Sequence, residues 1–323
     1  MNKSRVPKIL MPSLSSKIAL YDSILRQAKM FNPNASVIGA DSNPNCPGAD
    51  YVKYFKILPE IDILSTEDLL EILAKWRITH VLPTRDDELL YWAERAPLLL
   101  KHKVSVLTSS CDAINLCKNK LCFPQKIAVS ALKQIPSLLS PSESNYSKWV
   151  VKEQFGSGAR KVATALTRDD AVNYASSLKD PIFQPYIEGK EFSAEAWVDK
   201  NGQAPAVILR WRDKIVNGES HVSTTFKNFD WEKRIAKLFS SIDGLRGHCI
   251  GQFIVDHYEN LNLVEINPRL GGASPLTLSA GMNSILWSLC EETSEHFFEP
   301  DFQPLAGVRL TKLNGEVFIS YPN

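Results

Sequence analysis

Several features that would reveal a function at once are missing from this sequence. No apolar run approaches the roughly 18–20 residues that span a bilayer, and the run near the N-terminus stops at Pro12, too early for a signal-peptide core. The 37 Lys and Arg residues nearly balance the 36 Asp and Glu residues, which leaves a formal net charge of +1. Proteins whose main partner is DNA, RNA or an acidic membrane carry a basic footprint that is absent here. We therefore expect a soluble cytoplasmic protein that acts on small molecules.

Two common cofactor signatures are also missing. The six cysteines form no Cys-x-x-Cys pair and no histidine-flanked zinc pattern, so they are expected to be reduced thiols in the core. No Gly-x-Gly-x-x-Gly follows the first expected strand, residues 8–11, although Asp41 ends the second expected strand. The sequence therefore argues against a zinc site and against NAD binding.

What is present first is an alternation of strand-like and helix-like segments. Strands are expected over residues 8–11, 36–40, 79–82 and 104–107, and helices over residues 18–31, 66–76 and 86–100. Alternation of this kind favours a parallel sheet with crossover helices. A cluster of Pro, Ser and Asn at residues 135–145 then interrupts the pattern, and longer strands follow, which indicates an antiparallel sheet. The predicted fold class is α/β and α+β, without an internal repeat.

The segment Leu263-Val-Glu-Ile-Asn-Pro-Arg-Leu-Gly-Gly272 carries the most chemistry. Glu265 and Asn267 stand two residues apart on an apolar strand, so both side chains lie on one face of the sheet. Carboxylate and amide oxygens suit a hard cation such as Mg²⁺, and the planar fork of Arg269 can neutralise phosphate or carboxylate oxygens. The preceding strand, residues 251–256, forms a hairpin with this one and offers Gln252, or less favourably Asp256, as a further oxygen ligand.

Two earlier segments can hold a nucleotide. Residues 149–158 place Lys152 on a buried strand before the loop Gly156-Ser157-Gly158, where backbone N–H groups can approach phosphate oxygens. This loop does not match the Walker pattern, and it is equally compatible with an ordinary hairpin turn. Residues 183–191 form a short strand followed by a glycine turn and Glu191, which can offer backbone groups to an adenine edge and a carboxylate to ribose hydroxyls.

Together, and in this order, these segments resemble the ATP-grasp superfamily, in particular its carbamoyl-phosphate-synthase-like and amino-acid-ligase-like members. The resemblance implies an ATP-grasp fold behind an N-terminal parallel-sheet (pre-ATP-grasp, Rossmann-like) domain. It implies domains at residues 1–110, 111–187 (the small lobe, with the nucleotide lysines and the Gly-rich lid) and 188–323 (the C-terminal lobe, with the metal site). Asn119-Lys-Leu-Cys-Phe123 is similar to the family's Asp-Lys-x-x-Phe helix.

The resemblance also implies roles for individual residues. The catalytic residues would be Arg269, Lys152 and Lys120. The metal ligands for Mg²⁺ (or Mn²⁺) would be Gln252, Glu265 and Asn267. ATP would be bound by Lys120, Lys152, Gly156, Ser157, Gly158, Gln184, Pro185, Tyr186, Ile187 and Glu191. The sequence departs from the family pattern in having Asn119 where Asp is usual, and Pro185, which has no N–H, in the adenine hinge.

The implied activity is an ATP-dependent carboxylate–amine ligase that works through an acyl phosphate and releases ADP and phosphate. Two alternatives stay open: an enzyme that phosphorylates bicarbonate or carbamate, and a non-catalytic ATP-binding protein. Arg210, Arg212 and Arg269 are candidate contacts to a substrate carboxylate, and residues 13–16 and 84–88 are candidates for choosing the substrate. The expected partners are small-molecule acids and amines, with no nucleic acid or membrane, and a homodimer is possible.

Overall fold

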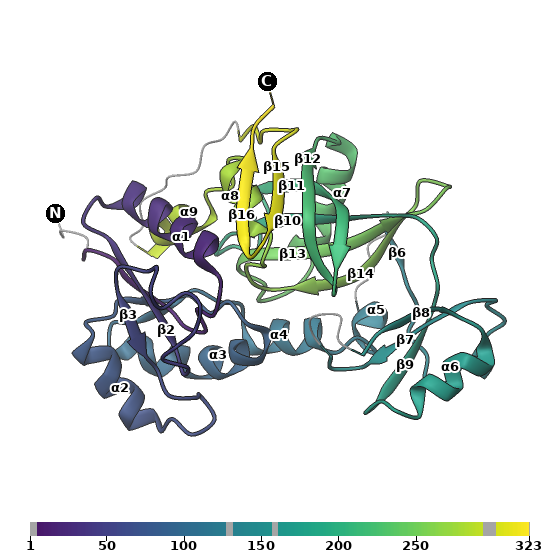
Figure 1. Cartoon of the computed structure of the whole chain (residues 1–323), viewed down its shortest axis with the longest axis horizontal. Helices are drawn as coiled ribbons and strands as arrows, with labels where there is room; N and C mark the ends of the chain where they lie inside the picture. Colours follow the sequence, from purple (N-terminus) through teal and green to yellow (C-terminus); the bar gives the residue numbers. More distant parts are fainter. Residues whose placement is uncertain (1–4, 127–131, 157–160, 293–301, 323) are drawn as a thin grey trace.

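A computed structural model of the protein describes residues 5–126, 132–156, 161–292 and 302–322. Three sheets organise it. Figure 1 shows the N-terminal sheet and a small sheet on opposite sides of the molecule, with a large sheet above and between them. Among the described residues, no helix is long and apolar enough to cross a membrane.

The N-terminal sheet is parallel, with strand order β3-β2-β1-β4-β5. This confirms the predicted parallel sheet, although β4 and β5 span only two residues each. The strands are β1 (Lys8–Met11), β2 (Ser36–Asp41), β3 (Phe55–Ile57), β4 (His80–Val81) and β5 (Ser105–Val106). The helices are α1 (Ile18–Phe31), α2 (Thr66–Lys75) and α3 (Asp86–Lys101). The strand order reverses between β1 and β4, where parallel sheets of this kind open a crevice beyond their carboxyl ends.

The small sheet has strand order β8-β7-β9 and is antiparallel. Its strands are β7 (Trp149–Glu153), β8 (Ala163–Leu166) and β9 (Pro181–Pro185), and helix α6 (Arg168–Ala175) packs on them. Trp149, Phe183 and Ala171 belong to a core that this unit does not share with the other sheets. This unit therefore has its own, small hydrophobic cluster.

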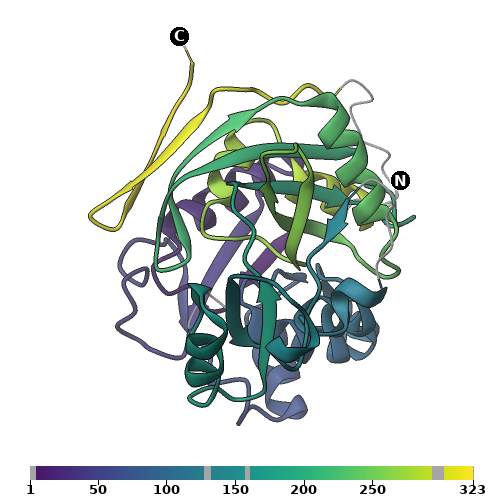
Figure 2. The ribbon, with the colours of Figure 1, turned by 90° about the vertical axis from the view of Figure 1, so that its right-hand side faces the viewer.

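The large sheet has eight strands in the order β16-β15-β12-β11-β10-β13-β14-β6. Its strands are β6 (Lys133–Gln134), β10 (Lys190–Val198), β11 (Ala206–Val216), β12 (Glu219–Phe226), β13 (Gly247–Val255), β14 (Leu261–Asn267), β15 (Arg309–Leu313) and β16 (Glu316–Ser320). All its pairings are antiparallel except β14 with β6, so the predicted antiparallel sheet is confirmed. Figure 2 shows the C-terminal hairpin β15–β16 in yellow at one edge of this sheet.

The faces of the large sheet are covered by different helices, as alternation along a strand requires. On β11, Val207 and Leu209 pack in the cluster that includes Phe239 of α7 (Phe229–Ser240). Ala206 and Ile208 belong to a second cluster with α8 (Ser274–Ser279) and α9 (Ser284–Glu292).

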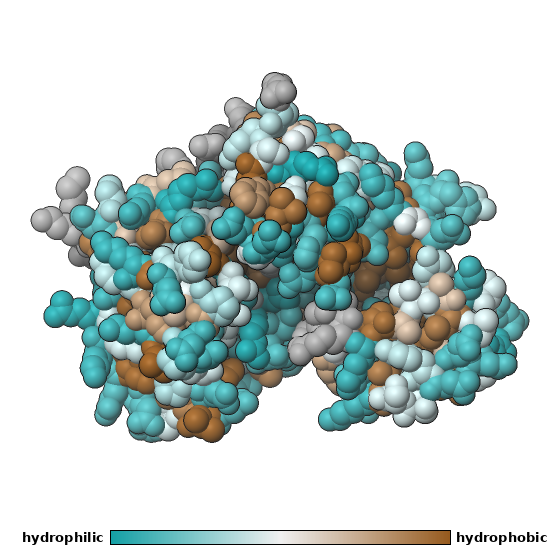
Figure 3. Space-filling model, in the orientation of Figure 1, coloured by the Kyte–Doolittle hydropathy of each residue, from teal (hydrophilic) through white to brown (hydrophobic). Residues whose placement is uncertain are grey.

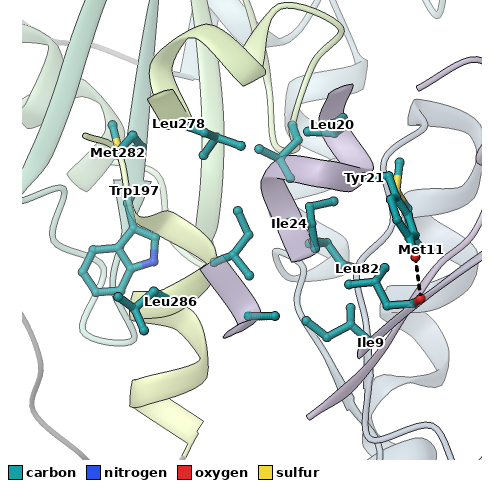
Figure 4. Close-up of a cluster of buried hydrophobic side chains, with 14 of the residues drawn as sticks. Ile9, Met11, Leu20, Tyr21, Ile24, Leu82, Trp197, Leu278, Met282 and Leu286 are labelled. Atoms are coloured by element: carbon teal, nitrogen blue, oxygen red, sulfur yellow. Dashed lines mark hydrogen bonds between the residues drawn. The ribbon is translucent and has the colours of Figure 1, made fainter. Parts of the chain in front are cut away.

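That second cluster joins the N-terminal sheet to the large sheet. Figure 4 shows α1 between the two, with Ile24 and Leu20 on one helix and Trp197 and Leu286 on the large-sheet side. Gln27, also on α1, is fully buried and donates from Nε2 to the Met282 carbonyl at 2.8 Å. The N-terminal domain is thus held to the C-terminal lobe by a continuous core, whereas the small sheet has a core of its own.

One predicted feature needs correction. Residues 119–122 do not form a helix: α4 (Cys111–Lys118) ends at Asn119, and Lys120 lies in a turn before the short α5 (Phe123–Lys126). The Asn119 side chain stabilises this turn by accepting from the N–H groups of Leu121 and Cys122. Strand β6, which the predicted boundaries assign to the small lobe, pairs with the large sheet. The domain boundaries themselves remain a prediction.

Candidate functional site

A cavity of about 590 Å³ opens between the small sheet and the large sheet and extends toward the N-terminal domain. Figure 3 shows the hollow between the two lower parts of the molecule. The described residues that were predicted for the site all line this one cavity: Lys120, Lys152, Gly156, Gln184, Pro185, Tyr186, Ile187, Glu191, Arg210, Arg212, Gln252, Glu265, Asn267 and Arg269. Ser157 and Gly158, also predicted, lie outside the described residues.

The metal corner is built by the β13–β14 hairpin. Gln252 lies opposite Glu265 in the register of the two strands, and Asn267 donates from Nδ2 to Glu265 Oε1 at 3.0 Å. That hydrogen bond turns the amide nitrogen of Asn267 toward the carboxylate. Three side chains that carry oxygen atoms are therefore side by side, as the spacing predicts.

These side chains fit a cation that takes its other ligands from substrate phosphates and water. Among the described residues, no group of three or more His, Cys, Asp or Glu side chains could hold a metal ion. The corner offers one carboxylate and two amides, and Mg²⁺ is typically bound by one or two carboxylates together with substrate phosphates and water. The donor set thus suits Mg²⁺ that arrives with a nucleotide.

Asp256, considered as a further ligand, has a local role. It accepts hydrogen bonds from the backbone and side chain of Asn260 and from the N–H of Tyr258. Burial alone would raise its pKa, but the hydrogen bonds from Asn260 outweigh burial and lower the pKa to about 2. Asp256 therefore closes the β13–β14 turn.

Two lysines face the cavity near this corner. Lys152 on β7 is 6% exposed, and burial lowers its pKa to about 8 although the nearby Glu265 carboxylate opposes the shift. Lys120 donates from Nζ to the Gly156 carbonyl. It also adds to the lowering of the Lys152 pKa, so the two ammonium groups act on each other. Two neighbouring cations in a shielded site are well placed for a polyanion.

The opposite end of the cavity contains the predicted adenine hinge. Gln184 is buried and donates from Nε2 to Ser137 Oγ at 2.8 Å. The Tyr186 N–H donates to the Lys148 carbonyl at 3.0 Å, so this amide is committed to holding the strand. Since Pro185 has no N–H, the backbone of Ile187 is the predicted hinge group that best suits an adenine edge.

Glu191 and the two arginines of β11 lie between hinge and metal corner. Glu191 Oε2 is 3.4 Å from Arg212 Nε, and Arg212 donates from Nη2 to the Gly218 carbonyl at 2.7 Å. Arg210 is 4% exposed, and donates from Nε to Glu195 at 2.7 Å and from Nη1 to Ser223. These contacts occupy two of the donor groups of Arg210, so Arg210 anchors the floor of the cavity. A substrate contact for either arginine remains a prediction.

Arg269 links the metal corner to the N-terminal domain. Strand β14 ends at Asn267, and the Arg269 side chain reaches Asp86 at the start of α3. Its Nε donates to Asp86 Oδ1 at 2.6 Å, and its Nη2 donates to the second oxygen, Oδ2. A bidentate pair of this kind fixes the plane of the guanidinium.

The loops predicted to choose a substrate meet at the strand-order reversal. Ser13, after β1, donates to Glu88 at 2.9 Å, and Lys17 donates to the Ser13 carbonyl and to Thr84 Oγ1. Glu88 accepts from the N–H groups of Thr84 and Arg85, which caps α3. Burial lowers the pKa of Lys17 to about 8, although the Glu88 carboxylate opposes the shift.

Two further residues, Glu219 and Lys312, line the cavity although no sequence motif indicated them. Each lies near an Asn-Gly turn with positive φ at both residues: 50° and 78° at Asn217-Gly218, and 50° and 85° at Asn314-Gly315. Asn-Gly between strand-like runs is the strongest short hairpin signal. This signal in the sequence could have revealed β11–β12 and β15–β16, though not their place at the cavity.

Comparison with known proteins agrees with this geometry. Residues 117–273 match the family model for an ATP-grasp domain. A phosphoribosylamine–glycine ligase of Methanocorpusculum labreanum is 23% identical over 195 residues, which are 53% of this chain and 44% of that protein. The match therefore spans less than half of that relative's length.

Solved structures share the fold over almost the whole chain. A biotin carboxylase of Campylobacter jejuni, solved with a β,γ-ATP ligand, superposes with a TM-score of 0.73 at 14% identity, covering 96% of this chain and 76% of that one. An L-amino acid ligase of Bacillus licheniformis gives 0.71 at 14% identity, with coverages of 96% and 80%. An N5-carboxyaminoimidazole synthetase of Staphylococcus aureus gives 0.67 at 15% identity, with coverages of 94% and 82%. Residues 117–273 thus match the ATP-grasp family model, and the chain as a whole shares the fold of these structures.

Proposed function

We propose that this protein is an ATP- and Mg²⁺-dependent ligase that joins a carboxylate to an amine. The observation that carries the proposal is the convergence of Glu265, Asn267, Lys152, Lys120 and Arg269 on one cavity. The curated relative and the amino acid ligase with the same fold are consistent with it.

The reaction divides into two transfers. A carboxylate oxygen of the acid attacks the γ-phosphorus of ATP, the bond to the β-phosphate oxygen breaks, and ADP leaves. The amine nitrogen then attacks the carbonyl carbon of the acyl phosphate, inorganic phosphate leaves, and the amine gives up a proton as the amide forms. Both steps build negative charge that catalysis must offset.

The residues of the chain have distinct parts in this proposal. Gln252, Glu265 and Asn267 would hold Mg²⁺, which when bound offsets charge on the phosphate oxygens. Lys120 and Lys152 bind the phosphates as cations. Arg269, held in plane by Asp86, presents its remaining donor surface to the transferred group.

The hinge and Glu191 bind the other end of ATP. The backbone of Ile187 takes the adenine edge, and the half-exposed Glu191 takes ribose hydroxyls. Arg212 Nε lies 3.4 Å from the Glu191 carboxylate, and both side chains line the cavity. With ATP bound in this way, the phosphates would lie at the lysines and the metal corner.

Phosphate release with paired substrates tests the proposal. The protein is incubated with ATP, Mg²⁺ and pairs of acids and amines, and released phosphate and new amides are measured by a colorimetric assay and mass spectrometry. We expect phosphate release that requires both an acid and an amine, with one amide formed per phosphate. Release that depends on bicarbonate alone would favour a carboxyl-phosphate-forming enzyme instead, and ATP binding without release would favour a non-catalytic nucleotide-binding protein.

A further inference from the structure

The end of the cavity away from the hinge is lined by side chains of both charges. Lys312 on β15 donates from Nζ to Glu219 Oε2 on β12 at 2.8 Å, and both residues line the cavity. The second pair, Arg269 with Asp86, lies in the same wall. The part of the chain that matches the ATP-grasp family model ends at residue 273, so Lys312 lies beyond it.

The Lys312–Glu219 pair is held by the structure around it. The Lys312 side chain is 16% exposed, whereas that of Glu219 is 64% exposed. Gly218, just before Glu219, accepts from Arg212, which ties the tip of the β11–β12 hairpin to the cavity wall.

Gly272 leaves the space that the pair needs on the side of the metal corner. A Cβ at position 272 would lie 3.1 Å from Lys312 Nζ and 3.7 Å from Glu219 Oε2. The first distance is tighter than ordinary van der Waals contact, so a side chain here would displace the Lys312 ammonium.

The fold does not need this pair for stability. Ion pairs with a solvent-exposed partner contribute little to the free energy of folding, and this one joins the tip of the β11–β12 hairpin to the neighbouring strand β15. Hydrogen bonding from Lys312 lowers the pKa of Glu219, so its carboxylate remains ionised at neutral pH. A cation and an anion 2.8 Å apart therefore line the cavity together.

An α-amino acid carries complementary charges on neighbouring atoms. Its carboxylate would pair with Lys312 and its ammonium with Glu219, which gives a four-charge arrangement in which no charge is unpaired. A simple carboxylic acid would meet the Glu219 carboxylate without compensation, and a simple amine would meet the Lys312 ammonium.

We propose that Lys312 and Glu219 form a subsite that recognises the carboxylate and ammonium groups of an α-amino acid substrate. In calling this amino acid a substrate, the proposal rests on the ligase function proposed above. The subsite itself is defined by binding, which can be measured without turnover.

Calorimetric titration of amino acids and their analogues into the protein, with Mg²⁺–ADP present, tests the subsite directly. The ligands are the twenty amino acids, their analogues with a 2-hydroxyl group in place of the ammonium, and the matching amines without the carboxylate. We expect at least one amino acid to bind about 10-fold or more tightly than both of its analogues, because each analogue leaves one charge of the pair unmatched. Equal affinity for an analogue, or no binding by any amino acid, would overturn the proposal.

Matched variants locate the effect. Lys312→Gln and Glu219→Gln should each weaken amino acid binding by about 10-fold, and Lys312→Arg should retain most of it. Lys214→Gln, at an exposed position on β11 outside the cavity, is the control for removing one positive charge. The affinity for ADP, measured for every variant, shows whether the hinge, lysines and metal corner that are proposed to bind the nucleotide are intact. Unchanged amino acid affinity in Lys312→Gln would place the ligand elsewhere.

The two proposals fail differently. Selective amino acid binding without phosphate release would support the subsite and contradict the proposed ligase function. Phosphate release with the same KM for 2-hydroxy acids as for amino acids would support the ligase function and contradict the proposed subsite.

Discussion

The two ends of the cavity are built in different ways. At the predicted nucleotide end, Gln252, Glu265 and Asn267 lie on the two strands of one hairpin, so strand pairing fixes their spacing, and Lys152 faces them from the small sheet. At the other end, Asp86, Arg269, Glu219 and Lys312 come from a helix start, a loop and two strands that are far apart in the sequence. The first arrangement is local and the second depends on how the three sheets pack. The predictions below test this difference.

The largest effect is expected at the metal corner. Glu265→Gln removes the only carboxylate among the three predicted metal ligands while preserving shape. We expect a fall in kcat of about 10³-fold with an unchanged thermal midpoint, since charge stabilisation is lost and packing is not. Steady-state phosphate release and calorimetry measure the two quantities.

Glu259→Gln, in the exposed turn of the same hairpin, is the matched control for this change. Undiminished turnover in Glu265→Gln would show that the metal assignment is wrong.

Ile24→Ala should loosen the packing on which the second end depends. Ile24 is fully buried in the cluster that α1 shares with α8, α9 and Trp197. Its truncation should lower the free energy of unfolding by about 2–5 kcal/mol, measured by urea denaturation. Met30→Ala, on the same helix but 54% exposed, should change it little. A similar loss in both variants would mean that the shared core does not hold the N-terminal domain.

Asp86→Asn separates the two ends further. The change leaves Arg269 without its charged partner, so the guanidinium loses its fixed plane. We expect kcat/KM for the acid to fall by about 10-fold, with ADP affinity close to that of the parent protein. Asp62→Asn, at an exposed position in the same domain and outside the cavity, is the control. An equal loss of ADP affinity would contradict the division into two ends.

The smallest effect is a pH dependence. Two lysines have a pKa of about 8: Lys152, which lines the cavity, and Lys17, in the N-terminal loops beside it. Phosphates bind the protonated ammonium, so ADP affinity should be constant below pH 8 and fall above it, by at most about 10-fold per pH unit. Lys152→Arg should remove this fall because guanidinium stays charged. Lys17→Arg should leave it in place. Titration of ADP between pH 6.5 and 9.5 checks both.

The same lysines affect stability with the opposite trend. Burial lowers their pKa in the folded state from 10.5, so the unfolded chain binds more protons between pH 8 and 10.5. The contribution of each lysine to the free energy of unfolding therefore rises with pH across that window and is smallest below pH 8. Denaturation of the nucleotide-free protein at pH 7.5 and 9.5 measures it against Lys152→Arg.

The local elements could be predicted because their causes are local. Helix α1 has the predicted bounds, since its apolar residues recur at helical spacing. The Glu265 and Asn267 pair follows from strand alternation. The helix expected at residues 119–123 was wrong because the Asn119 side chain bonds two following backbone N–H groups, which favours a turn over helix.

The contacts at the end of the cavity away from the hinge could not be predicted from local sequence patterns. Residues 84–88 were suspected of a role in choosing the substrate, but nothing near Asp86 in the sequence indicates Arg269, which is 183 residues away. Likewise, the Asn-Gly turns at 217–218 and 314–315 predict hairpins, yet not that β15 pairs with β12 and brings Lys312 to Glu219.

The sequence by itself determined the strand that carries Glu265 and Asn267, the two lysines before it, and their order along the chain. Side-chain alternation and turn chemistry act over a few residues, so they can be read without the fold. Only the tertiary structure decided that the N-terminal loops and the C-terminal hairpin meet this strand in one cavity. Those meetings depend on the hydrophobic core around α1 and on the pairing of β12 with β15, which bring together residues that no local pattern connects.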